Sequence, residues 1–325
     1  MRALLATGLL LLTWLPCRSD VVQDLAGLRD RCLSFAAGHA PTDPTALTLR
    51  HGLYAQSPTA PTGRVDLAAS GFSLAALPAA VAHGVLSSNQ AFVIASDAAR
   101  QVRLMVAKSA AASLPAQIDR YGYAGVLFHY PVWNEAAGEF RGKADVEISP
   151  IDTALLLYGL LVSAEYFGGP VRADYEAARD AIRWRDWLDT TTTGHQNQFR
   201  AAYYAGRGFS GWWDWYTHEA MLISVFAAMS DRTINPRDVW RGWRRDFQTY
   251  TSPPPDSKVF SCCATYFGDP FTVCYGLAFL DFERFPPDVD GVDWFRQGQM
   301  AYQAHVEFFR SERGYRDGLT AGFSS

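Results

Sequence analysis

The segment Glu147–Phe167 (EISPIDTALLLYGLLVSAEYF) carries the clearest structural pattern in the sequence. From position 150 onward it is strongly apolar with little polar surface, which predicts a helix buried on most of its sides. Ser149 is a suitable N-cap residue for such a helix. Two carboxyl groups, those of Glu147 and Asp152, therefore lie where a buried helix begins, and Asp152 falls near the positive end of its dipole.

Further helices are predicted on both sides of this segment, and long apolar helices alternate with amphipathic ones. One or two short β-hairpins are expected between them, the clearest within residues 121–141. Such alternation is what inner and outer rings of helices require, although an irregular bundle would have the same periodicity. The predicted helices cover 21–37, 71–86, 88–108, 150–167, 172–188, 213–229, a segment beginning at Asn235-Pro236, and 293–313.

The composition limits the classes of function. The 325 residues are 49% hydrophobic and 19% charged, with a net charge of −4. Residues 20–325 can form one domain with a large core. Because no cluster of Lys or Arg stands out, a nucleic-acid partner is not expected. The ten Trp residues either fill an aromatic-rich core or line a sugar cleft, because the apolar faces of sugars stack on aromatic rings.

Residues 1–19 have the pattern of a signal peptide. Arg2 provides a positive start, an apolar run continues to Leu15, and small residues precede a cleavage point before Asp20. A retained membrane anchor is the alternative, but the run is short for a span. The mature protein is therefore expected to be secreted or periplasmic, free of the membrane, and a monomer.

Four cysteines remain after the predicted cleavage: Cys32, Cys262, Cys263 and Cys274. An even number of cysteines in an exported protein permits disulfides, and four allow three pairings among which the sequence does not choose. No Cys and His spacing indicates a zinc site. We expect neither a metal nor another cofactor.

A second acidic residue stands out within Gly211–Met221 (GWWDWYTHEAM). Glu219 begins an apolar run and follows a group of aromatic residues, so its carboxyl group should be partly desolvated. Desolvation raises the pKa of a carboxyl group, as a general acid requires near neutral pH. The alternative is a Glu on an exposed helix stripe. The aromatic residues predicted to line a cleft here are Trp212, Trp213, Trp215 and Tyr216.

Other polar candidates have equally plausible structural explanations. Asp152 could serve in a capping box with Ser149. Asp281 lies among apolar residues and could simply pair with Arg284. His129, between two aromatic residues, is a candidate for substrate binding but is more often structural in such a setting.

Asp145 and Glu165 are weaker candidates.

Glycoside hydrolysis requires two carboxyl groups beside a surface on which a sugar can stack, and the sequence offers both as a pattern.

The motifs, taken in order, resemble a known family. Glu147–Phe167 is similar to the "E-(I/V)-S-x-I-D-T-A-L-L" segment of the glucoamylase-like family, which includes endo-β-1,2-glucanases and a domain of cyclic β-1,2-glucan synthases. Trp213–Met229 resembles its "W-x-x-Y-x-E-A-M" helix, and Phe279–Phe282 resembles its "W-(I/L)-D-F-R". The segment that starts at Val292 resembles its "D-(W/Y)-F" helix, and the likeness covers most of residues 65–325.

The resemblance implies an all-α fold, an (α/α)6 toroid with short hairpins, and cleavage of β-glucan, most specifically an endo-acting, inverting reaction on β-1,2 bonds. It implies that Glu219 is the acid and that Asp152 and Glu147 lie near the cleaved bond. Asp152 is the second acid we expect to be catalytic; Glu147, His129, Asp281 and the four aromatic residues are expected to bind substrate.

One departure concerns the end of the chain. The family's "W-G-L-T-A-S-D" corresponds here to Asp317–Phe323 (DGLTAGF), where the Trp and the last acid are replaced. The chain also stops at Ser325, where members of the family continue through more helices, so the predicted toroid is expected to be incomplete at its C-terminal side. A transglycosylase with the same site, or a glycan-binding protein that lacks the catalytic base, are the alternatives.

Overall fold

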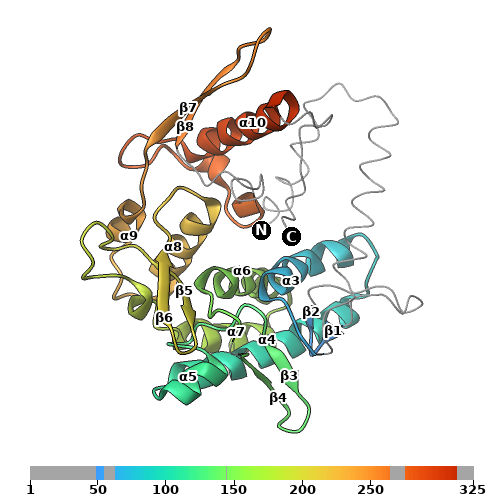
Figure 1. The fold of residues 1–325 in the computed structure, drawn as a ribbon. Coiled ribbons are helices and arrows are strands. Elements are labelled where there is room, and N and C mark those ends of the chain that lie inside the picture. The colour runs from blue at the N-terminus through green and yellow to red at the C-terminus, as the bar shows by residue number, and fades with distance from the viewer. Residues whose placement is uncertain (1–48, 55–62, 144, 264–274, 313–325) are drawn as a thin grey trace.

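The computed structural model describes residues 49–54, 63–143, 145–263 and 275–312 (Figure 1). This part of the chain is mainly helical. Its α-helices are α3 (Leu67–Ala82), α4 (Ser88–Ala111), α5 (Pro115–Tyr121), α6 (Pro150–Phe167), α7 (Gly169–Ala181), α8 (His218–Ser230), α9 (Pro236–Gly242) and α10 (Trp294–Glu312). Short 3₁₀ helices cover Trp184–Trp187, Tyr275–Ala278 and Phe282–Arg284.

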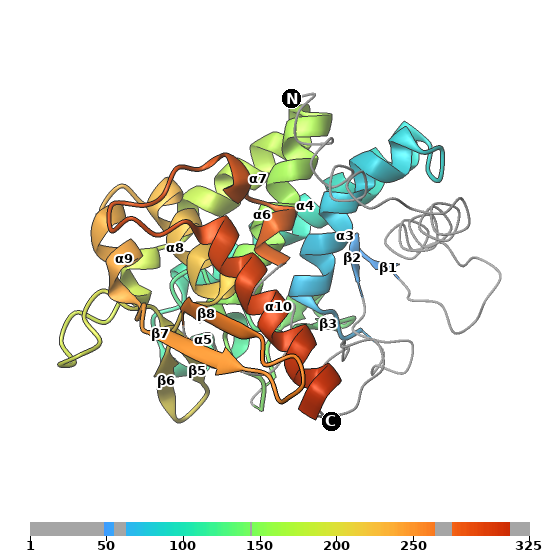
Figure 2. The same ribbon diagram turned by 90° about the horizontal axis from the view of Figure 1, so that it is seen from above.

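The described strands pair only as two-stranded antiparallel hairpins, which confirms a helical fold with short hairpins. In Figures 1 and 2 the last of these hairpins extends alongside α10, which it contacts. The hairpins are β1 (Leu49–Arg50) with β2 (Leu53–Tyr54), β3 (Val132–Asn134) with β4 (Glu139–Arg141), β5 (Arg200–Tyr204) with β6 (Gly208–Trp212), and β7 (Phe247–Thr251) with β8 (Val259–Cys263).

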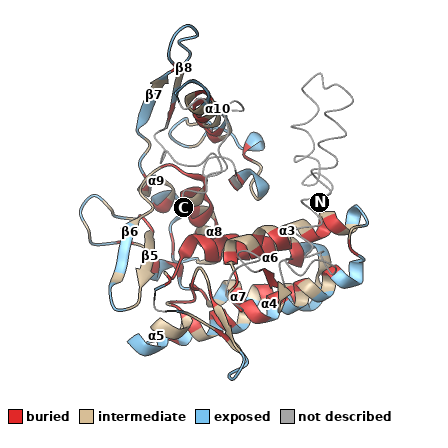
Figure 3. Cartoon of the chain, turned by 45° about the vertical axis from the view of Figure 1, so that its right-hand side comes forward, coloured by how far each residue is buried: buried red, intermediate tan, exposed pale blue. Residues whose placement is uncertain are grey.

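Helix α6 has the predicted bounds and the predicted burial. Thirteen of its 18 residues are buried. It contacts α3 and α8, which are also largely buried, whereas α4 and α7 pack together with more exposed outer faces (Figure 3). The helices thus form an inner layer of α3, α6 and α8 and an outer layer of α4 and α7. This is the layering that the alternation of apolar and amphipathic helices predicts.

Helices α3 and α6 run in the same direction, and their backbones are in close contact. A Cβ atom at Gly71 would lie 2.3 Å from the Leu155 carbonyl oxygen, and one at Gly159 would lie 1.9 Å from the Gly71 carbonyl oxygen. One turn further along, the Ser163 hydroxyl donates to the Leu74 carbonyl oxygen at 2.8 Å. Because both helices begin at the same end of this contact, their N-termini and the carboxyl groups there come together.

Several predicted boundaries are corrected. Helix α3 begins four residues before the predicted position, because Asp66 caps it by accepting from the Ala69 amide at 2.9 Å. The helix predicted for 172–188 is α7 followed by the first 3₁₀ helix. The proline-rich loop 252–256 lies within the connection between β7 and β8. Several predictions fall outside the described residues: those for the signal peptide, the helix at 21–37, Cys32, Cys274 and the segment 317–323.

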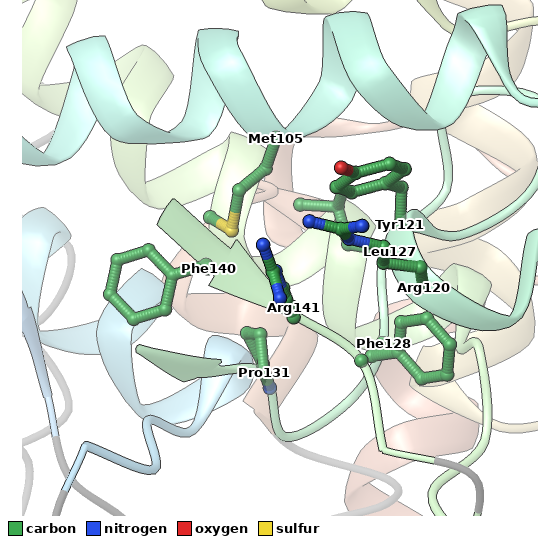
Figure 4. Close-up of a pocket in the computed structure, with 9 residues that line it drawn as sticks. Met105, Arg120, Tyr121, Leu127, Phe128, Pro131, Phe140 and Arg141 are labelled. Atoms are coloured by element: carbon green, nitrogen blue, oxygen red, sulfur yellow. The ribbon is translucent and has the colours of Figure 1, made fainter. Parts of the chain in front are cut away.

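A group of ion pairs attaches the β3–β4 hairpin to the outer helices. The Glu139 carboxylate accepts hydrogen bonds from three cations, Lys108, Arg120 and Arg141. Burial alone would raise the pKa of Glu139, but these cations outweigh burial and lower it to about 2. Beside them, Met105, Phe128 and neighbouring residues enclose a cavity of about 10 Å³, enough for roughly one water molecule (Figure 4).

Replacing Glu139 with glutamine is expected to lower the free energy of unfolding at pH 7 by about 1–2 kcal/mol, since the cations are partly exposed. The pKa of Glu139 is lower in the folded protein than its ordinary 4.5. Its stabilising effect is therefore complete above pH 4.5 and is lost as the pH falls towards 2. Urea titrations at pH 7 and pH 3 should show the variant's deficit shrinking at pH 3.

Glu135→Gln is the matched control for this prediction. Glu135 is on the same hairpin turn and pairs with Arg50, but 74% of its side chain is exposed. We expect little change in its unfolding at either pH. An equal loss of stability in the two variants would show that the three cations on Glu139 add nothing specific.

Cys262 is buried and not in a disulfide. Among the described residues, no helix is long and apolar enough to cross a membrane.

Candidate active site

The first element of the site is the short segment that leads into α6. Ile148 pairs with Phe128 on one side and with Tyr203 of β5 on the other. The next residue, Ser149, donates its amide to the Leu127 carbonyl oxygen at 2.9 Å and then caps α6. This pairing holds residues 127–129 beside 147–149. It therefore brings His129 next to Glu147 and to the first turn of α6.

His129 lies between two carboxyl groups. Its Nδ1 is 2.8 Å from Glu147 Oε1, and its Nε2 is 3.3 Å from Asp152 Oδ1. The imidazole ring also stacks on Tyr130, with the centroids 3.7 Å apart and the planes 19° apart. Burial would lower the pKa of His129, but the hydrogen bond to Glu147 and the nearby carboxylates, Asp152 foremost, raise it instead.

Asp152 is the most buried acid of the group, with 7% of its surface exposed. Burial raises its pKa to about 6 against the opposing effects of His129 and of a hydrogen bond with Ser149. Its own amide donates to the Ser149 hydroxyl oxygen at 3.4 Å. The predicted capping box is corrected: the Ser149 amide donates to the Leu127 carbonyl oxygen and not to Asp152, so Ser149 caps the helix while the Asp152 carboxyl group faces His129.

Glu147 has the opposite electrostatic character. The hydrogen bond from His129 lowers the pKa of Glu147, and burial opposes this change. Its side chain is 29% exposed, whereas that of Asp152 is 10% exposed. The site therefore joins a more exposed carboxylate, whose pKa is lowered, to a buried carboxyl group whose pKa burial raises to about 6. Acid–base chemistry uses this kind of separation between two carboxyl groups.

Sequence reasoning did not identify Asp66 and Arg64 as members of this group. Asp66 caps α3, and its charge raises the pKa values of His129 and Asp152. The amide of Leu67, the first residue of α3, donates to the His129 carbonyl oxygen at 3.3 Å. Arg64 lies over the Tyr130 ring, 4.3 Å from its centroid. The signal that could have identified Asp66 is an Asp directly before an apolar helical run.

Glu219 is the second residue of α8, at the start of the neighbouring inner helix. Thr217 caps this helix by accepting from the Ala220 amide at 3.0 Å. Glu219 is half-buried, so it is not on a fully exposed stripe. Helices α8 and α6 contact each other, and the Tyr158 hydroxyl donates to the Leu222 carbonyl oxygen at 3.1 Å. Glu219 and Asp152 therefore both stand in the first turn of adjacent inner helices.

Two of the predicted cleft aromatics are held by polar groups. The Trp212 indole donates to Asp189 Oδ2 at 2.8 Å, and its ring stacks on His195 with the centroids 3.8 Å apart. Arg244 lies over the Trp215 ring, 3.8 Å from its centroid. Both Trp side chains are partly exposed. Each Trp ring therefore has part of its surface available to a ligand.

The other two aromatics lie deeper. Trp213 is partly exposed and packs against both hydrophobic clusters of the core. Tyr216 has no exposed surface, and its ring packs against Trp243 and Trp294. The prediction that Tyr216 lines a cleft is therefore corrected. Its ring lies in the hydrophobic core beside Trp243 and Trp294 and offers no face to a sugar.

Asp281 is paired with a neighbouring cation. Its Oδ2 is 3.0 Å from Nε of Arg284, which is the ion pair anticipated as its structural explanation. Asp145 is exposed and pairs with Lys143, and Glu165 pairs with Arg172 near the other end of α6. The described part of the chain contains no group of three or more His, Cys, Asp or Glu residues that could hold a metal ion.

The fold is similar to that of several solved structures. A "putative glucoamylase" from Bacteroides uniformis aligns with 90% of this chain and 67% of its own, at 13% identity and a TM-score of 0.63. An endo-β-1,2-glucanase from Chitinophaga pinensis, solved with sophorotriose and glucose, aligns with 90% of this chain and 69% of its own (14% identity, TM-score 0.58). A β-1,2-glucanase from Parabacteroides distasonis aligns with 93% and 43% respectively (13% identity, TM-score 0.65).

No family model matches the chain, and no curated protein matches it. The solved structures confirm, at the level of the fold, the resemblance to glucoamylase-like proteins that include β-1,2-glucanases. At these low identities the likeness concerns the fold, and chemistry has to be argued from the site.

Proposed function

We propose that this protein is a glycoside hydrolase that cleaves β-glucan, acting within chains of β-1,2-linked glucose by an inverting acid–base reaction. The observation that supports this most directly is the buried Asp152 carboxyl group, with a pKa raised to about 6, beside the ionised Glu147 at the start of an inner helix. The likeness of the fold to β-1,2-glucanases suggests the substrate class.

In this proposal Glu219 protonates the leaving glycosidic oxygen, and Asp152 is the second essential acid. Inversion needs about 6.5–9.5 Å between the acid and the base, so that a water molecule fits on the opposite face of the sugar. Glu147 binds the sugar at the cleavage point, and His129, whose ring nitrogens face Glu147 and Asp152, acts on the sugar through these two carboxyl groups. Both catalytic candidates begin neighbouring inner helices, which is a rigid base for such a spacing.

The partly exposed rings of Trp212, Trp213 and Trp215 are proposed to stack on glucose units beyond the cleavage point. Asp281 is proposed as a more distant polar contact. The proposed setting is outside the cytoplasm, supported by the signal-peptide pattern of residues 1–19, with the protein acting as a monomer on an oligo- or polysaccharide.

Replacing Glu219 with glutamine should reduce the release of reducing ends from linear β-1,2-glucan by roughly 10²–10⁴-fold, because the proton donor is lost. Glucan binding, measured by affinity electrophoresis, should persist. The same reactions with added sophorose identify the chemistry, since elongated products would indicate a transglycosylase.

A non-catalytic glycan-binding protein is the second candidate, favoured by the altered segment Asp317–Phe323. It predicts that wild type and Glu219→Gln bind the glucan equally and that neither releases reducing ends. Wild-type turnover that Glu219→Gln retains in full would instead exclude Glu219 as the acid.

A further inference from the structure

His129 lies between two carboxyl groups, and each of the two contacts that its ring nitrogens make with them requires a proton. Nδ1 lies at hydrogen-bond distance from Glu147, so an N–H on Nδ1 donates to that carboxylate. Nε2 then faces Asp152 Oδ1 at 3.3 Å. A bare Nε2 lone pair would repel an ionised carboxylate there. One further proton must therefore lie on this contact, on Nε2 or on the Asp152 oxygen.

The charges around His129 favour placing that proton on the imidazole. Three carboxyl groups face it from two segments: Asp66 at the cap of α3, and Glu147 and Asp152 at the start of α6. Arg64, which lies over Tyr130, is the nearby cation. With all three acids ionised, the five groups carry a net charge of −1 if His129 is charged and −2 if it is neutral. The Tyr130 ring against His129 also suits a cation.

We propose that His129 is a positioning residue: as an imidazolium it bridges Glu147 and Asp152, fixes the direction of both carboxylates, and keeps Asp152 ionised in its buried position. An ionised Asp152 can accept the proton of the attacking water molecule, as the base of the proposed inverting reaction must. The proposal rests on the proposed function for its catalytic consequence, but the protonation state of His129 can be measured without activity.

The direct test is a ¹⁵N NMR titration of the His129 ring. We expect both ring nitrogens to be protonated at pH 6.5, and the transition to the neutral ring to occur above the ordinary pKa of 6.5. In Asp152→Asn the transition should move to lower pH, because an attracting charge is removed. A ring that is already neutral at pH 6.5, or a transition that Asp152→Asn leaves in place, would overturn the proposal whether or not the protein is an enzyme.

Kinetics provide the second test, with two neutral substitutions of similar reach. In His129→Asn the amide can replace the donor to Glu147, and in His129→Gln it can replace the donor to Asp152. Both remove the positive charge. We expect each to lower kcat on the order of 10²-fold with little change in KM, because a misplaced reacting group affects turnover most.

The pH dependence separates positioning from simple support of the fold. Loss of the cation raises the pKa of Asp152, so the limb of the kcat/KM profile that reports it should move up by about one pH unit in both variants. A purely structural role would lower the amount of folded enzyme and leave both limbs in place. If the limb does not move, while the wild-type ¹⁵N titration shows the expected transition above pH 6.5, the effect of His129 on catalysis would be contradicted and its protonation state would stand.

Discussion

Replacing Asp152 with asparagine is expected to lower kcat/KM on β-1,2-glucan by roughly 10²–10⁴-fold and to leave the fold intact. The exchange keeps the shape of the side chain but removes its ability to ionise. Because Asp152 is only 7% exposed and is placed by the first turn of α6, no water or neighbouring acid can readily take over its role. Turnover of the purified variant, followed by the release of reducing ends, measures the loss.

The same substitution has a stability consequence of opposite sign. The pKa of Asp152 rises from its ordinary 3.8 to about 6 on folding, so its ionisation costs stability, and this cost grows as the pH rises from about 4 to above 6. Asp152→Asn removes the cost. We therefore expect a Tm at pH 7.5 no lower than that of the wild type, as is common when a catalytic group is replaced.

Asp145→Asn is the matched control, since Asp145 lies in the same connection but is 67% exposed and pairs with Lys143. It should keep wild-type kcat/KM. If Asp152→Asn kept full activity, or lost it only together with its folded structure, Asp152 would have no chemical role.

Replacing Gly159 with alanine is expected to destabilise the protein by about 3 kcal/mol, the upper end of what an overpacked core usually costs. The new Cβ atom would lie 1.9 Å from the Gly71 carbonyl oxygen and 2.6 Å from its carbonyl carbon. These are backbone atoms of the facing helix, so no side chain can rotate away. Helices α3 and α6 would have to separate, and with them the carboxyl groups at their N-termini.

The sign of the change in stability distinguishes the close contact of the two helices from helix propensity. Helix propensity alone predicts that Gly→Ala in a helix interior stabilises by about 1 kcal/mol. Ala177→Gly on the exposed face of α7 measures that propensity in this protein and should cost about 1 kcal/mol. Urea denaturation of both variants decides the point, and a Gly159→Ala protein more stable than the wild type would exclude the close approach of α3 and α6.

The sequence predicts the parts of this fold that local chemistry determines. Helix α6 has the predicted bounds because Ser149 caps it, its apolar residues extend around all faces, and Gly168 ends it with a φ of 65°. The strands of β5–β6 and β7–β8 were not predicted, since each is held by its partner strand across a turn. The sequence predicts that a helix starts at Gly71, whereas in the structure Gly71 contacts α6 four residues after the helix begins.

The candidate site was predicted as separate residues and not as a group. Glu147 and Asp152 share one segment, so their proximity is readable from sequence. His129 joins them only because Ile148 pairs with Phe128, a long-range contact with no local signal. Tyr216 shows the opposite failure. It follows the Trp residues directly in the sequence, but packing against Trp243 and Trp294 turns its ring into the core.

Hydrolysis of β-glucan by this site is tested by counting the reducing ends that the purified wild-type protein releases from linear β-1,2-glucan. Chromatography of the products identifies them, with β-1,3- and β-1,4-glucans compared in parallel. We expect short β-1,2-linked oligosaccharides that accumulate with time and are absent with Asp152→Asn. A folded protein that binds the glucan and releases no reducing ends from any of the three substrates would contradict it.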